Sequence, residues 1–257
     1  AWKVYAADSS SYDLDGTNTT SVRPLFHFDA ALWNGVDATD NPSDSTTLDA
    51  SEVWTDRAHG KTTIGNATAS EQPIYMSSGE NSKPYVDCDG GDLLKLSEPY
   101  ALRGPFTLFG VAKTEASQRM AFIGIAMSKV TEGNFNPYFA WGSTVEYLFF
   151  QHTGAANGVH ASAGGSTAYT TTRSFIIPRD SSDDTSVFLD GDNCVSDGTT
   201  WGPSTCVDPM VITQLLKGGA YGATGEVYET ALWDSDLSAA DRNELGDYVI
   251  AKYGLSF

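Results

Sequence analysis

The sequence lacks several features that would place it in a protein class at once. It has three cysteines and no apolar run long enough to cross a bilayer. Lys and Arg number 15 against 33 Asp and Glu, which gives a net charge of −18. A field of that sign repels phosphate backbones and anionic lipid, so we expect neither nucleic-acid binding nor membrane insertion. Divalent cations, cationic partners and simple solubility remain compatible with it.

The N-terminus lacks both Met and the charged and apolar regions of a signal peptide. Removal of a leader and trimming of an initiator Met each account for this, and the sequence does not separate them. Residues 1–24 are polar after an apolar start and are expected to form an arm or an outer strand. We expect this arm to dock on a neighbouring subunit, and residues 25–257 to form one domain.

The three cysteines do not indicate whether the protein is located in an oxidising or a reducing compartment. Cys194 and Cys206 flank a loop that a disulfide could close, and the sequence favours neither the bonded nor the reduced state. Cys88 lies in an apolar, strand-like context, where we expect it to act as a small buried hydrophobe.

Short apolar or alternating segments recur along the chain with turn residues between them. Residues 106–112 and 121–127 are continuous apolar runs typical of buried strands, and residues 185–189 lead into an Asp-Gly turn. Many short strands at a spacing of roughly ten residues indicate a β-sandwich or a jelly roll. We find no internal repeat, linker or second domain.

The C-terminal segment has the clearest pattern. Residues 226–233 alternate in character and predict a strand. Ser238 and Asp241 have capping-box spacing at the start of a helix predicted over residues 239–253, and Gly254 is placed to end it. One face of that helix carries Leu245, Tyr248, Val249 and Lys252 or Tyr253. It is therefore expected to pack against the sheet.

Several motifs occur in the order found in laminin-G-like, concanavalin A-like jelly-roll domains. They are Phe28-Asp29-Ala30, Trp54-Thr55-Asp56, the segment 84–94 with Cys88 where an aromatic residue is usual, the hairpin 187–191, and the closing segment 225–255. The chain resembles this family over about residues 25–257. The resemblance implies an all-β, two-sheet antiparallel jelly-roll sandwich with a short C-terminal α-helix.

Hydrolases of that superfamily carry three acids on one strand, as Glu-x-Asp-x-x-Glu, and the chain lacks this triplet. Glu226 and Glu229 are three residues apart on the predicted closing strand, so alternation places them on opposite faces. His152 and His160 flank a glycine-containing loop without a ligand at metal spacing. We therefore expect that the protein is not an enzyme, with a polysaccharide lyase or hydrolase as the third hypothesis.

Oxygen ligands for a hard cation lie on three predicted turns. Asp89 with Asp92, and Asp190 with Asp192 and Asn193, offer ligands of the type that calcium prefers. The turn Asp13-Leu14-Asp15 with Asn18 is a third option, although it lacks the remaining EF-hand positions. The resemblance allows calcium at sheet edges. The alternative is that these aspartates stabilise their own turns.

Exposed aromatic faces are the usual platform for glycans. Trp201, Tyr169 and Tyr221 lie in loops rich in glycine and threonine and are the candidate ligand-binding residues. The tryptophans expected in the core are Trp33, Trp54, Trp141 and Trp233.

Two hypotheses about function rank above that of a lyase or hydrolase. The first is a non-catalytic structural or adhesion protein at a virion surface or outside the cell, decorating a capsid or forming a fibre, with virion or self subunits as partners. The second is a secreted or cell-surface glycan-binding module.

Overall fold

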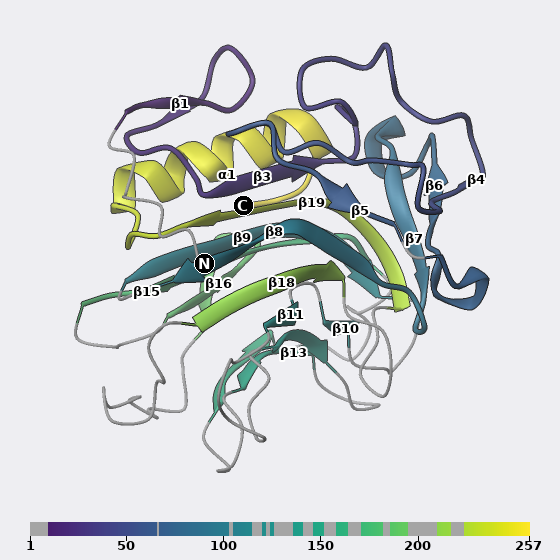
Figure 1. Cartoon of the computed structure of the whole chain (residues 1–257). Helices are drawn as coiled ribbons and strands as arrows, with labels where there is room; N and C mark the ends of the chain where they lie inside the picture. The colour runs from purple at the N-terminus through teal and green to yellow at the C-terminus, as the bar shows by residue number, and fades with distance from the viewer. Residues whose placement is uncertain are drawn as a thin grey trace.

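The computed structural model describes residues 10–65, 67–102, 105–114, 120–121, 124–125, 136–140, 146–151, 158–163, 171–181, 186–194, 210–216 and 224–257. These residues are mostly β-strands in antiparallel sheets, with one α-helix near the C-terminus (Figure 1). The predicted fold class is confirmed. Within the described part of the chain, no helix combines the length and the apolar character needed to span a membrane.

The largest sheet has nine strands and is built around β19 (Thr224–Trp233). On one edge β19 pairs with β9 (Phe106–Thr114), and on the other with β7 (Tyr85–Asp89) and then β3 (Phe26–Asp29). The remaining strands are β15 (Arg173–Arg179), β16 (Val187–Leu189), β17 (Asp192–Cys194), β6 (Ile74–Met76) and β4 (Thr46–Thr47).

A second layer lies on one face of this sheet, and helix α1 (Ala239–Tyr253) lies on the other (Figure 1). The second layer holds β11 (Gly124–Ile125), β18 (Met210–Leu216), β8 (Leu94–Leu102) and β5 (Thr63–Ile64). Another four-stranded sheet contains β10 (Met120–Ala121), β12 (Asn136–Ala140), β13 (Glu146–Gln151) and β14 (Gly158–Ala163). The strands β1 (Tyr12–Asp13) and β2 (Thr19–Thr20) form a hairpin, and η1 (Ala69–Glu71) and η2 (Glu80–Ser82) are single 3₁₀ turns.

Two hydrophobic clusters fill these layers. Phe28 and Trp54 belong to the cluster between the sheets, and Phe109 and Tyr248 to the cluster under the helix. Trp33, Trp54 and Trp233 are buried as expected, whereas Trp141 lies outside the described residues. Cys88 is also buried in the core, which confirms its prediction.

Helix α1 begins and ends where the sequence predicts. The amide of Asp241 donates to Ser238 Oγ at 3.2 Å, and Gly254 adopts a left-handed conformation with φ of 68°. The capping box differs in one respect, because the Asp241 carboxylate accepts from the amide and the hydroxyl of Ser21. This contact fastens the N-terminal segment to the helix.

The described part of the N-terminal segment packs against its own domain. Tyr12 and Leu14 are buried in the cluster beneath the helix, and Thr20 is buried beside them in β2. The predicted division at residue 25 stays a prediction, as does an arm that docks on a neighbour, since residues 1–9 lie outside the description.

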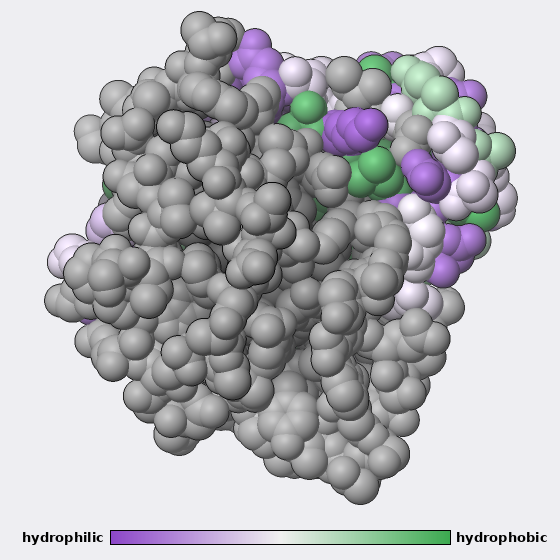
Figure 2. Space-filling model, turned by 60° about the horizontal axis from the view of Figure 1, so that its bottom comes forward, coloured by the Kyte–Doolittle hydropathy of each residue, from purple (hydrophilic) through white to green (hydrophobic). Residues whose placement is uncertain are grey.

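Exposed apolar side chains are scattered over the described surface. The large ones are Val36, Val53, Ile74 and Ile250. Figure 2 shows one face of the molecule, on which hydrophobic and hydrophilic residues of the described part alternate without merging into one patch.

Candidate binding pocket under the C-terminal helix

Strand β3 brings polar side chains under the helix. Phe26 and Phe28 join the cluster between the sheets, so alternation directs His27 and Asp29 to the opposite face. In an antiparallel sheet with one open face, such polar residues would meet solvent. Here the helix and the N-terminal segment cover them, and His27 and Asp29 are 0% and 1% exposed.

Strand β19 adds acidic side chains to the same face through a β-bulge. Glu226 lies opposite Lys113 and Glu229 lies opposite Val111, so Tyr228 is an extra residue on β19. Because Lys113 and Val111 are two residues apart, Glu226 and Glu229 share one face. The prediction that they point to opposite faces is wrong, since a bulge resets the alternation on which it depended.

Glu229 is the centre of a buried polar network. Its Oε1 accepts from the Tyr248 hydroxyl at 2.7 Å and contacts His27 Nε2. Its Oε2 accepts from the Tyr253 hydroxyl and from Lys252 Nζ, each at 2.7 Å. Burial alone would raise the pKa of Glu229, but Lys252 and His27 hold that pKa well below its ordinary value. Glu229 is therefore a buried, ionised carboxylate.

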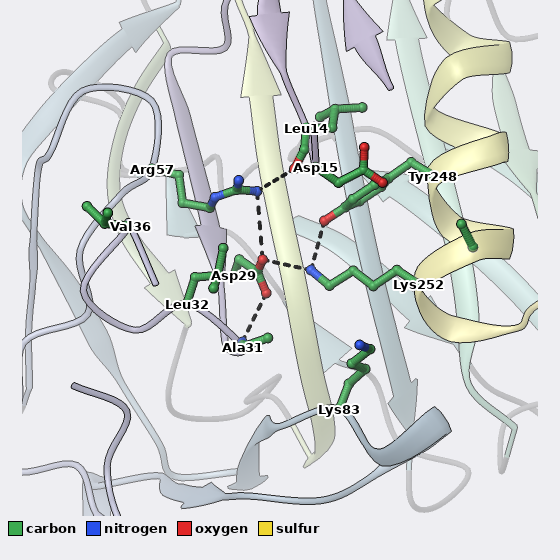
Figure 3. Close-up of a pocket in the computed structure, with 11 residues that line it drawn as sticks. Leu14, Asp15, Asp29, Ala31, Leu32, Val36, Arg57, Lys83, Tyr248 and Lys252 are labelled. Carbon is green, nitrogen blue, oxygen red and sulfur yellow. Dashed lines mark hydrogen bonds and ion pairs between the residues drawn. The ribbon is translucent and has the colours of Figure 1, made fainter. Parts of the chain in front are cut away.

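Lys252 links this network to the surface. Its Nζ lies 2.7 Å from Asp29 Oδ2, and Arg57 lies 3.8 Å from the same oxygen (Figure 3). Arg57 also donates to the Leu14 carbonyl at 2.8 Å, and the Ala31 amide donates to Asp29 Oδ1 at 3.0 Å. Both oxygens of Asp29 are thus held by groups from separate segments of the chain.

A cavity of about 480 Å³ opens above these charged groups (Figure 3). Its lining combines charged side chains with aliphatic ones: Leu14, Asp15, Asp29, Ala31, Leu32, Val36, Arg57, Lys83, Tyr248, Ala251 and Lys252. In Figure 3 the Lys83 side chain extends from the segment after η2 towards Lys252. The volume falls in the range of small-ligand pockets, and polar groups from five separate segments converge on it.

Tyr248, Tyr253 and Glu229 each keep one protonation state near neutral pH. Burial and the nearby Glu229 carboxylate raise the pKa values of Tyr248 and Tyr253 well above the ordinary value, so both hydroxyls stay neutral donors. Glu229 stays charged for the reason given above. The network therefore presents Lys252 and Asp29 in a preorganised arrangement, which suits recognition of a polar ligand.

Sequence reasoning missed this site. Asp29 appeared only as part of a family motif, and Lys252 only as a residue on the inward face of the helix. The available signal was the presence of polar residues on two faces that the fold buries. A buried Asp beside a half-buried Lys predicts an ion pair, and such pairs gather at functional sites.

The predicted calcium ligands lie elsewhere, in separate turns. Asp92 follows β7 and accepts from the Asp89 amide at 2.7 Å. Asp190, in the turn between β16 and β17, accepts from the Ser174 amide at 2.8 Å and pairs with Arg173. Among the described residues, no three acidic, histidine or cysteine side chains gather where they could hold a metal ion. Calcium binding stays a prediction.

The other predicted site residues are not described. Trp201, Tyr169, Tyr221, Cys206 and His152 lie outside the described residues. Only the backbone is described for Asp192 and Cys194 in β17 and for His160 in β14. The glycan role of the aromatics, the disulfide, and the extracellular or virion-surface location remain predictions.

No protein-family model and no curated protein sequence matches the chain. Among solved structures, it is similar to the Trypanosoma rangeli sialidase in complex with the inhibitor DANA, with a TM-score of 0.54 and 12% identity. That match covers 87% of this chain and 32% of the sialidase, so the chain spans about a third of the sialidase's length. It is also similar to domain 4 of AbnA, a GH43 extracellular arabinanase from Geobacillus stearothermophilus, in complex with arabinotriose. Here the TM-score is 0.53 and the identity 12%, covering 87% of this chain and 98% of the domain.

These neighbours show the fold, and they correct one prediction. The absence of the acid triplet led us to expect a protein that is not an enzyme. The fold occurs in a sialidase and in an arabinanase, both glycoside hydrolases, which contradicts that expectation. One missing motif does not exclude catalysis on such a fold. The comparisons show a fold that is shared with these domains and give no support to a virion role.

Proposed function

We propose that this chain binds a carbohydrate in the pocket between helix α1 and the N-terminal loops. The observation that carries the proposal is the pocket itself, where Arg57, Asp29 and Lys252 are preorganised by a buried carboxylate. Sugars offer many hydroxyl groups, and a rim of fixed donors and acceptors beside aliphatic side chains is suited to them. The cavity of about 480 Å³ has room for a short oligosaccharide or the end of a longer one.

The fold supports the same proposal. Domain 4 of AbnA, which this chain covers almost completely, was solved with arabinotriose. We include in the proposal the finer assignment to concanavalin A-like, laminin-G-like jelly rolls, which the sequence motifs suggest. The glycan-binding module, the second hypothesis from the sequence, thus becomes the leading one.

Blocking the pocket tests the proposal. Ala251 is exposed and lines the pocket, whereas the adjacent Ile250 is exposed on the same helix and does not line it. We expect Ala251→Trp to abolish oligosaccharide binding because the indole fills the cavity, and Ile250→Trp to leave binding unchanged. Calorimetric titration with arabinotriose and a glycan panel, with and without calcium, measures both variants and the wild type.

Two results would overturn the proposal. One is a folded Ala251→Trp variant that binds the same glycan with wild-type affinity, which would place the site elsewhere. The other is a wild-type chain that binds no member of the panel at millimolar concentrations, which is the weakest useful affinity for a lectin-like site.

A further inference from the structure

The pocket's two acids are already occupied by the protein. Asp29 is held by Lys252, Arg57 and the Ala31 amide. The Asp15 carboxylate accepts from the amides of Thr17 and Asn18 at 2.9 and 2.8 Å. Asp29 is therefore already paired with cations of the protein, and the Asp15 carboxylate is bonded to uncharged donors.

The cations differ among themselves. Lys252 is neutralised by Asp29 and Glu229, and Arg57 donates to a carbonyl and faces Asp29. The Lys83 ammonium forms no ion pair or hydrogen bond with any described residue, and it extends into the pocket (Figure 3). In a chain with 33 acids and only 15 Lys and Arg, a cation that forms no ion pair with a described residue is unusual.

The backbone holds Lys83 in a fixed place. Its amide donates to the Glu80 carbonyl at 2.9 Å and its carbonyl accepts from the Gly79 amide at 2.7 Å. The side-chain amide of Asn81 donates to the Lys252 carbonyl at 2.9 Å, which joins this turn to the end of helix α1. Asn81 and Ser82 both have positive φ, 47° and 58°, a conformation that costs free energy in residues other than glycine. The strained turn delivers one unneutralised ammonium to the pocket.

We propose that the pocket selects acidic saccharides, with an oxyanion on the sugar, a carboxylate or a sulfate, bound by Lys83. This inference rests on the proposed glycan-binding function and names its ligand class. A charge-assisted hydrogen bond to an oxyanion is stronger than one to a hydroxyl, and Lys83 loses no internal partner in forming it. The remaining hydroxyls of the sugar then face Arg57 and Asp29.

The test compares two trisaccharides that differ only at C6. An α-1,4-linked galacturonate trimer carries carboxylates where the matching galactose trimer carries hydroxymethyl groups, and galactose 6-sulfate separates sulfate from carboxylate. We expect Lys83→Met to weaken binding of the acidic probe about tenfold or more, the equivalent of one charge-assisted hydrogen bond, and to leave the galactose trimer unchanged. Lys83→Arg should keep most of the affinity.

Lys95→Met is the matched control, because Lys95 is exposed on β8 and does not line the pocket, and its loss changes the net charge equally. An effect of Lys95→Met as large as that of Lys83→Met would mean that only the overall field matters, and would overturn the inference. So would equal affinity of Lys83→Met and wild type for the acidic probe, or a wild type that binds only the galactose trimer or no acidic probe. If Ala251→Trp abolishes binding and Lys83→Met does not alter it, only this inference fails. If Ala251→Trp has no effect, the proposed function fails as well.

Discussion

Two buried carboxylates, one on strand β19 and one in the turn after β7, behave in opposite ways. Glu229 is 1% exposed and Asp92 is 3% exposed, so both are removed from water to a similar degree. The pKa of Glu229 is held well below its ordinary value by Lys252 and His27, although burial opposes this. Burial raises the pKa of Asp92 to about 6, with further contributions from Asp89 and Asp87. Burial is common to both residues, and the sign of the shift is set by the partners.

The difference follows from the origin of those partners. Glu229 meets groups from β3 and from helix α1, which lie on distant parts of the chain and include a cation. Asp92 meets neighbours from its own turn, which are acidic. Tertiary contacts with a cation therefore keep Glu229 ionised beneath the pocket. The residues near Asp92 in the sequence are acidic and raise its pKa.

Of the variants considered, removal of the Lys252 cation should reduce the free energy of unfolding most. Lys252→Met leaves the carboxylates of Glu229 and Asp29 facing each other across a buried site, and we expect a loss of about 3–5 kcal/mol in the free energy of unfolding at pH 7. Urea unfolding measures it. The loss should shrink as the pH falls below 4.5, the ordinary pKa of Glu229, because a carboxylate with a lowered pKa contributes its full stability above that value and loses it progressively as the pH falls towards the folded-state pKa.

Lys95→Met is again the appropriate control, since the same chemical change at an exposed position should alter stability by less than about 0.5 kcal/mol. A Lys252→Met variant with wild-type stability would mean that Glu229 is protonated in the native protein, contrary to the contacts described above.

A smaller effect is expected from a single donor. Tyr253→Phe removes one of the hydroxyls that donate to Glu229 while keeping the ring in the hydrophobic cluster. Hydrogen bonds to charged groups contribute about 1.5–3 kcal/mol, so we expect a loss in that range at pH 7. The loss should diminish on acidification below 4.5, as for Lys252→Met. A loss that is the same at pH 3.5 and pH 7 would indicate that only packing had changed.

The sequence was sufficient for the features that depend on local pattern. The helix from Ala239 to Tyr253, its cap at Ser238 and the burial of Cys88 all follow from periodicity and residue type. The side of the sheet occupied by Glu226 could not be predicted, because the bulge at Tyr228 coincides with the change of partner from β7 to β3, a long-range event.

The candidate pocket could not be predicted from the sequence for a related reason. No local pattern marks the charged residues of the pocket, which are Asp29, Arg57, Lys83 and Lys252. They meet only after strand β3, the helix and the loops between them have packed together. The aspartate pairs were conspicuous because they are local. Asp89 and Asp92 bond within their own turn, whereas Asp190 bonds to Arg173 and Ser174 on the neighbouring strand β15. Local clusters of acids therefore predict sites in turns, whereas the pocket forms from residues that are far apart in the sequence.

Removal of the Asp92 charge should have the smallest effect and should stabilise the protein. Asp92→Asn keeps an oxygen that accepts from the Asp89 amide and removes the charge. The pKa of Asp92 is raised in the folded state from 3.8 to about 6, so stability falls as the pH rises from 3.8 to about 6, and the full cost remains above 6. A rise of two pKa units sets an upper limit near 3 kcal/mol. A weaker hydrogen bond offsets part of it, so we expect the variant to gain about 1–2 kcal/mol at pH 7.5 and about nothing at pH 3.5.

Calcium gives the same variant a second use. If Asp89 and Asp92 bind calcium, the cation neutralises their repulsion, and millimolar calcium should stabilise the wild type at pH 7.5 and stabilise Asp92→Asn much less. If calcium leaves both proteins unchanged while the variant is more stable at pH 7.5, the raised pKa is a consequence of burial and acidic neighbours alone. A variant that is less stable than the wild type at pH 7.5 would contradict the comparison, because Asp92 would then have a compensating partner of the kind that Lys252 provides for Glu229.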